Sequence, residues 1–83
     1  MSYFNGFDSY GNSYRVEEYG NDIGMVVIGV GKLKAVRLAP STYMGTNGQV
    51  YAANQNNCSV YSSPQWVNWA RNKMYSLGFL PEF

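Results

Sequence analysis

The sequence predicts a small α+β domain in which an antiparallel sheet of four to five strands, built from hairpins, is packed by one C-terminal helix. Three observations predict it: a long apolar β-branched run from Gly24 to Val30, turn residues that divide the middle of the chain, and one segment of helical periodicity near its end. With 83 residues the chain forms a single domain, 1–83, which is large enough for one core but not for a cleft between domains.

The first twelve residues, 1–12, mix aromatic side chains with Gly, Asn and Ser. We interpret them as a loop or edge strand whose rings cap the core. Antiparallel strands are predicted across residues 13–61. The first runs from Ser13 to Tyr19, where side chains alternate along the segment, and Gly20-Asn21-Asp22 ends it with a turn.

The next segment, Ile23 to Leu38, predicts a hairpin that is apolar on both faces. Its first strand lacks polar alternation, which is typical of a strand buried on both sides. Gly31-Lys32 fits a two-residue turn with glycine first. The resulting register places one set of pairs on each face: Val30/Leu33 and Ile28/Ala35 on one, Val27/Val36 and Met25/Leu38 on the other. Neither face is polar, so both need cover.

A second hairpin follows Pro40, which stops the preceding ladder. Asn47-Gly48 tolerates the left-handed conformation of a tight turn, so Thr42 to Gly45 and Gln49 to Ala53 are predicted to pair. Residues 54–57 are expected to form a loop, and Cys58 to Tyr61 a short last strand.

The clearest helix is predicted over 64–77. Ser63 is a good cap residue, Pro64 fits the first helical position, and Gly78 is well placed to end the helix before the tail, 78–83. The apolar stripe consists of Val67, Ala70, Met74 and Leu77, with Trp66 beside it. One helix covers one face of the sheet, so the other face is left to the N-terminal segment, the tail or another chain.

The chemistry of the side chains argues against an enzyme. The chain has no histidine, the usual general base and the commonest metal ligand, and one cysteine, Cys58, whose neighbours carry no charge. Glu17 and Glu18 point to opposite faces of a strand, so they cannot converge on a cation. We therefore predict no catalytic residue, no cofactor site and no metal site.

Charge and hydropathy limit the classes of partner that the protein can bind and indicate its cellular location. The net charge is +1 and only 13% of residues are charged, which excludes strong attraction to phosphates and acidic DNA mimicry. Weak binding of single-stranded nucleic acid stays open, with Lys32, Lys34 and Arg37 as its contacts. No apolar run is long enough to span a membrane and no leader-like pattern opens the chain, so a cytoplasmic location is expected.

The aromatic content is the main positive signal. Eight tyrosines, two tryptophans and four phenylalanines stand among Asn, Ser and Gly, a composition typical of protein-binding surfaces. We predict a non-enzymatic protein-binding module that captures a partner protein or forms a homodimer; the alternative is a self-assembling structural subunit. The tyrosines expected to border the uncovered sheet face are Tyr14, Tyr19, Tyr43 and Tyr51.

In its size and its Tyr- and Asn-rich composition the chain resembles small phage-encoded proteins that bind and inhibit host machinery, anti-CRISPR proteins among them. That resemblance implies an inhibitor or accessory factor. It concerns general character and assigns no residue.

Overall fold

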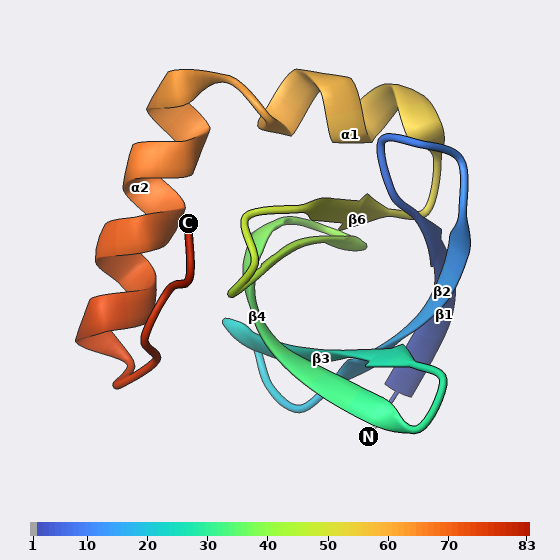
Figure 1. Ribbon diagram of the computed structural model, residues 1–83, viewed down its shortest axis with the longest axis horizontal. Coiled ribbons are helices and arrows are strands. Elements are labelled where there is room, and N and C mark those ends of the chain that lie inside the picture. The colour runs from blue at the N-terminus through green and yellow to red at the C-terminus, as the bar shows by residue number, and fades with distance from the viewer. Residues whose placement is uncertain (1) are drawn as a thin grey trace.

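Within residues 2–83, which the computed structural model describes, six strands precede two helices (Figure 1). The class is α+β as predicted, but the sheet is a closed six-stranded barrel rather than a sheet of four to five strands. Its elements are β1 (Ser2–Phe7), β2 (Ser13–Glu18), β3 (Ile23–Ile28), β4 (Gly31–Ala39), β5 (Thr42–Gly45), β6 (Val50–Ala52), α1 (Gln55–Tyr61) and α2 (Pro64–Ser76).

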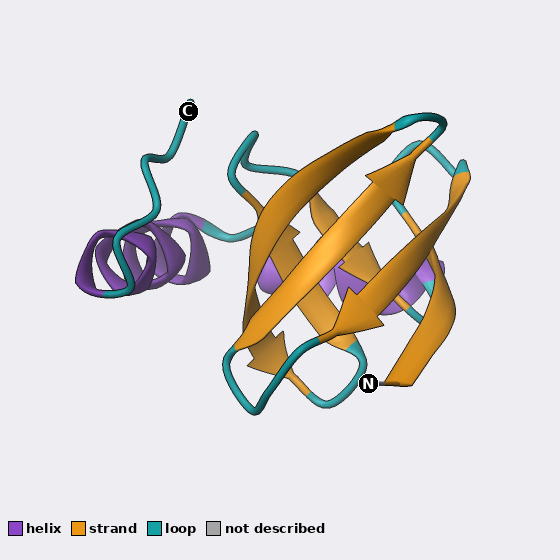
Figure 2. Cartoon of the chain, turned by 90° about the horizontal axis from the view of Figure 1, so that it is seen from below, coloured by secondary structure: helices purple, strands orange, loops and turns teal. Residues whose placement is uncertain are grey.

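The barrel is an antiparallel meander in which each strand pairs with the next, and the tilted strands wrap around a common axis (Figure 2). Closure comes from β1 and β6, which pair at one position, Phe7 with Ala52. Closing the sheet turns one of its faces into an interior, so that face is covered without any further element.

Barrel closure covers the inner face of the β3–β4 hairpin, where an exposed sheet face was one of the expectations, while Ile28 and Val30 beside the hairpin turn stay exposed. One face belongs to the cluster inside the barrel, formed by Val16, Val26, Ala35, Tyr43 and Tyr51 with Phe4, Tyr14 and Leu33 packed against it. On the other face, Val36 and Leu38 of β4 join the cluster between barrel and helices, which also includes Met44, Ala70 and Met74.

The hairpin turn lies at Gly29-Val30 rather than at Gly31-Lys32. Ile28 pairs with Gly31 and Val26 pairs with Leu33, and Gly29 has a φ of 57°, which glycine adopts without strain. The predicted register was wrong, but the displacement is an even number of positions. The side chains that remain in the two strands consequently keep their predicted faces, whereas Val30, predicted to pair with Leu33, lies in the turn and is exposed.

The N-terminal segment contributes a full strand to the barrel. Phe4 of β1 packs against the interior cluster, as expected of a ring that caps the core. Tyr3 and Tyr10 are exposed instead, because Tyr3 points outward from the barrel and Tyr10 lies in the β1–β2 turn.

Residues 55–61 form a helix, α1, where a loop and a short strand were expected. The side chain of Asn54 accepts a hydrogen bond from the amide of Asn56 at 2.7 Å and caps the helix. Cys58 is buried on the side of α1 that faces the barrel, and the Sγ atom of Cys58 donates to the carbonyl of Phe7. The segment is too short for its hydrophobic periodicity to distinguish a helix from a strand. The tertiary contacts that bury Cys58 thus favour the helix.

The predicted C-terminal helix is confirmed as α2, which packs on β4 and buries Ala70 and Met74. Ser63 occupies the cap position, although its hydroxyl makes no capping bond. At the other end Gly78 has a φ of 83°, its amide donates to Tyr75, and the amide of Phe79 donates to Met74, a Schellman ending. No helix within residues 2–83 is both long and apolar enough to cross a membrane.

The C-terminal tail turns back beside α2 (Figure 1) and contacts both α2 and the β5–β6 turn of the barrel. The amide of Glu82 donates to the carbonyl of Thr46 at 2.7 Å, and the Phe83 ring packs against Gly48 in the β5–β6 turn. The guanidinium of Arg71 lies 4.9 Å from the centroid of the Phe83 ring. These contacts fasten α2 to the barrel.

Candidate functional site

The four tyrosines expected at a contact surface do not form one. Tyr43 and Tyr51 are 0% and 2% exposed and lie inside the barrel, where Tyr14 packs edge-on to Tyr51 with ring centroids 5.3 Å apart. Tyr19 is the exposed member, at 49%. Closure of the barrel turned the face bearing three of these rings inward, so they fill the core.

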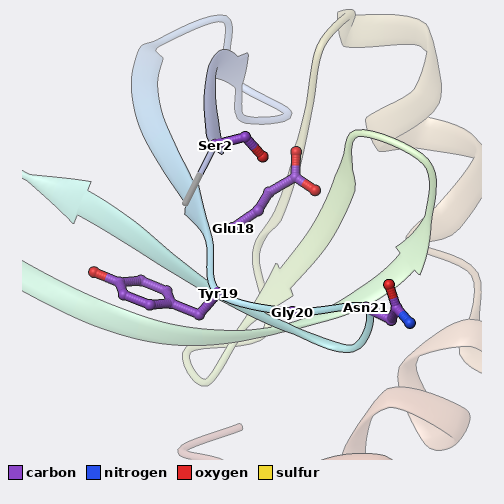
Figure 3. A pocket seen from close by; sticks show the side chains of 5 residues that line it. All are labelled: Ser2, Glu18, Tyr19, Gly20 and Asn21. Atoms are coloured by element: carbon purple, nitrogen blue, oxygen red, sulfur yellow. The ribbon is translucent and has the colours of Figure 1, made fainter.

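A shallow concavity of about 530 Å³ lies at one end of the barrel, lined by Ser2, Glu18, Tyr19, Gly20 and Asn21 (Figure 3). The Ser2 hydroxyl and the Glu18 carboxylate point toward the same space, whereas the Tyr19 ring points away from it (Figure 3). The Glu18 carboxylate also accepts a hydrogen bond from the Tyr43 hydroxyl at 3.1 Å.

The electrostatics of this barrel end favour a structural role. Burial, followed by the charge of Glu18 and its hydrogen bond, raises the pKa of Tyr43 to about 12. The phenol therefore remains a neutral donor to Glu18. The lining residues, among them the Ser2 hydroxyl and the Glu18 carboxylate, offer hydrogen bonds to a polar group.

The structure brings together two of the three basic residues considered for nucleic-acid contact. Lys32 and Lys34 lie on the outer face of β4, opposite Val27 and Met25 of β3. Arg37 is separate from them: its Nη1 and Nε lie 3.4 Å from the carbonyl oxygens of Asn21 and Ala39.

Arg15 joins the two lysines on this outer face. Its guanidinium lies 3.8 Å from the centroid of the Tyr3 ring. Glu17, on the same face, is held between Arg15 Nη2 at 3.9 Å and Lys32 Nζ at 3.4 Å. Glu17 and Glu18 thus point to opposite sides of β2, and residues 2–83 contain no group of three or more His, Cys, Asp or Glu suited to a metal ion.

Cys58 has the surroundings of a structural thiol. Burial raises its pKa, and its Sγ is directed at the carbonyl of Phe7. A thiol that is buried and protonated is a poor nucleophile.

An apolar cleft lies between α2 and β4 and is lined by Leu38, Gln65, Trp66 and Trp69; we call it the Trp cleft. Its volume is about 260 Å³. Trp66 and Trp69 are three positions apart on α2, so they share one side of the helix. Trp69 is 43% exposed, while Leu38, the last outward apolar residue of β4, forms a buried wall.

The rings behind the cleft are packed edge to face. Tyr61 lies 4.8 Å from Trp66, and Trp66 lies 5.9 Å from Trp69, measured between ring centroids. Such contacts are favourable and directional. These contacts hold the Trp69 ring in place at the surface. Because the ring is already ordered, it loses less conformational entropy when a partner binds.

The cleft belongs to a long segment without charge. From Leu38 to Ala70 the sequence contains no Asp, Glu, Lys or Arg, and this segment supplies all of β5, β6 and α1 and every residue that lines the Trp cleft. Interface cores are depleted of charge and enriched in aromatic residues. This gap in charge, with two tryptophans three residues apart inside it, is the sequence signal that could have located the site.

Comparisons with models of protein families, with curated proteins and with solved structures give no match to this chain. The functional argument therefore depends on the chemistry of the site.

Proposed function

We propose that the chain is a non-enzymatic protein-binding module that contacts its partner through the Trp cleft. The observation that supports this proposal is a half-exposed tryptophan, Trp69, which borders an apolar cleft within an uncharged segment. Tryptophan and tyrosine dominate the binding energy of many interfaces, because they bury a large rigid area.

The chemistry of the cleft favours a protein over other partners. A surface without charge does not attract phosphates, and the cleft presents an indole ring and the aliphatic wall of Leu38. An apolar side chain of a partner protein would fill this space, and Gln65 would offer it a hydrogen bond at the rim. An inhibitor or an accessory factor would both act through binding of this kind.

Capture from a lysate of the organism that encodes the chain, with three forms of the protein, tests the proposal. Trp69→Ser removes the exposed ring of the cleft, and Tyr10→Ser removes an even more exposed ring in the β1–β2 turn as the matched control. A partner retained by the parent and by Tyr10→Ser should be lost with Trp69→Ser, at a cost of about 2 kcal/mol or more in affinity. Equal retention by all three forms would contradict the proposed surface.

Single-stranded nucleic-acid binding is a second candidate, favoured by Arg15, Lys32 and Lys34 on one outer face beside the exposed Tyr3 ring. Glu17 neutralises part of this charge, so the binding would be weak. Three cations predict a slope of log affinity against log salt of about −2. An oligonucleotide titration with a slope near zero, or one unaffected by Lys34→Ala, would exclude this candidate.

A further inference from the structure

The seam of the barrel, where β1 meets β6, is open along most of β1. The strand pairs with β2 from Ser2 to Phe7, but with β6 only at Phe7 and Ala52. Beyond Ala52 the chain leaves the sheet for α1, and a concavity of about 380 Å³ marks that point, lined by Phe7, Ala53, Asn54, Gln55 and Asn56. Among residues 2–83, no strand accompanies the outer edge of β1 from Ser2 to Gly6.

The main-chain groups at this edge belong to Tyr3 and Asn5. The amide of Asp8 donates to the carbonyl of Asn12 at 3.0 Å, where the β1–β2 ladder begins. Main-chain groups alternate between the two sides of an antiparallel strand, so the even-numbered residues of β1 exchange hydrogen bonds with β2. Cys58 reaches the Phe7 carbonyl from the other side, as this alternation requires. Two donors and two acceptors therefore face the open edge.

The edge lacks the features that normally protect one. The sequence of β1, Ser-Tyr-Phe-Asn-Gly-Phe, contains no charged residue and no proline, and both Tyr3 and Asn5 are exposed. Proteins usually block free strand edges with lysine, proline, bulges or covering loops. A short uncharged strand rich in aromatic residues is a favourable partner for another strand.

We propose that two copies of the chain join through this edge, with β1 of one copy antiparallel to β1 of the other and a two-fold axis at Phe4. In this register Tyr3 of each copy lies opposite Asn5 of the other. Each main-chain N–H of Tyr3 and Asn5 in one copy then donates to a main-chain carbonyl of the other copy, and each carbonyl accepts from an N–H there. A two-fold interface must be self-complementary, and this edge satisfies that condition because Tyr3 and Asn5 are placed symmetrically about Phe4.

The side chains also suit self-pairing. The axis brings the Phe4 rings of the two copies together, and aromatic pairs across strands are favourable. No charged side chain of β1 meets its own copy, so no like-charge repulsion opposes the dimer. This interface uses a different surface from the Trp cleft and is independent of the proposed function.

Sedimentation over a wide range of protein concentrations tests the dimer with a matched pair of variants. Asn5→Pro removes one amide donor from the open edge without removing a β1–β2 hydrogen bond, because Asn5 faces away from β2. Asn5→Thr changes the same side chain but keeps the amide. The parent and Asn5→Thr should dimerise as concentration rises, whereas Asn5→Pro should stay monomeric with an unchanged near-ultraviolet circular dichroism spectrum.

Amide hydrogen exchange in the unmodified chain gives a second measurement that does not depend on how the proline variant folds. The amides of Tyr3 and Asn5 should exchange more slowly as the protein concentration rises. Exchange that is independent of concentration, a parent chain that stays monomeric throughout, or a dimer that Trp69→Ser disrupts and Asn5→Pro does not, would each overturn the proposal.

Discussion

The hydroxyl of Tyr43 donates a hydrogen bond to Oε2 of Glu18, 3.1 Å away, across one end of the barrel. Tyr43 lies on β5 and Glu18 on β2, two strands that are not neighbours in the sheet. The bond therefore connects opposite walls of the barrel. Because the pKa of Tyr43 is raised to about 12, the phenol stays protonated and keeps donating even near pH 10.0, where an ordinary tyrosine ionises.

This bond predicts that stability falls as the pH rises from 10 to 12. Tyr43 loses its proton near pH 10.0 when unfolded but only near 12 when folded, so the folded state binds the proton more tightly in that window. The associated stability is complete below pH 10 and is lost progressively above it. Burial also raises the pKa of Tyr51, which adds to the same trend.

Urea unfolding at a series of pH values measures this decline. Tyr43→Phe should be less stable than the parent by about 1 kcal/mol at neutral pH and should show a shallower decline above pH 10. An equally steep decline in that variant would mean that Tyr43 is not its source.

Gly24 should be intolerant of a side chain. A Cβ at this position would lie 2.7 and 2.8 Å from two atoms of the Tyr43 ring, which packs directly on the Gly24 backbone. Gly24→Ala should therefore cost about 1–3 kcal/mol in the free energy of unfolding. Gly20→Ala is the control, since a Cβ there meets nothing within 4 Å. Equal stability of the two variants would show that the Tyr43 ring is not packed on Gly24.

The inner face of α2 should be essential for folding. Met74→Asp would bury an unpaired carboxylate where Met74 is fully enclosed between α2 and the barrel. A domain of this length has roughly 4–12 kcal/mol of stability, so this variant should unfold or melt at a much lower temperature. Asn72→Asp places the same charge on the exposed side of α2 and should melt like the parent. A Met74→Asp variant with the parent's melting temperature would mean that this face is wrongly assigned.

Removal of the first strand tests whether the N-terminal aromatic segment is part of the core or is dispensable for folding. A chain without residues 2–9 lacks Phe4 and leaves β2 and β6 unpaired at the seam. We expect a product that binds a hydrophobic dye and has lost near-ultraviolet circular dichroism while it keeps much of its secondary structure. A well-folded product would show that the segment is dispensable for the core.

Local pattern predicted β2 to β6 and α2, but it predicted a loop and a strand where α1 lies, left β1 as a loop or edge strand, and did not predict closure of the barrel. Which face of β3 or β4 a side chain occupies follows from the period of two along a strand. An error of an even number of positions in the register does not change that face. Closure depends on Phe7 and Ala52, which are far apart in the sequence, and on the twist of the sheet between them. No local pattern carries that information.

The site was mislocated for the same reason. Tyr43 and Tyr51 were expected at the surface because eight tyrosines exceed what an open sheet and one helix can bury. The barrel interior accommodates these two rings and gives each hydroxyl a partner, Glu18 or Asn47. Trp66 was correctly placed beside the buried stripe of α2, but Trp69, which is 43% exposed, was not singled out.

The most direct test of the Trp cleft as the binding surface uses the chain's own two tryptophans. Trp66 and Trp69 both line the cleft, so incorporation of fluorotryptophan places a fluorine label only there, whatever tryptophans the partner contains. Fluorine NMR is then recorded while unlabelled captured partner is added to saturation. We predict that the Trp69 resonance, assigned with Trp69→Phe, shifts and broadens as the ring is buried; two resonances that stay unchanged at saturation would contradict the account.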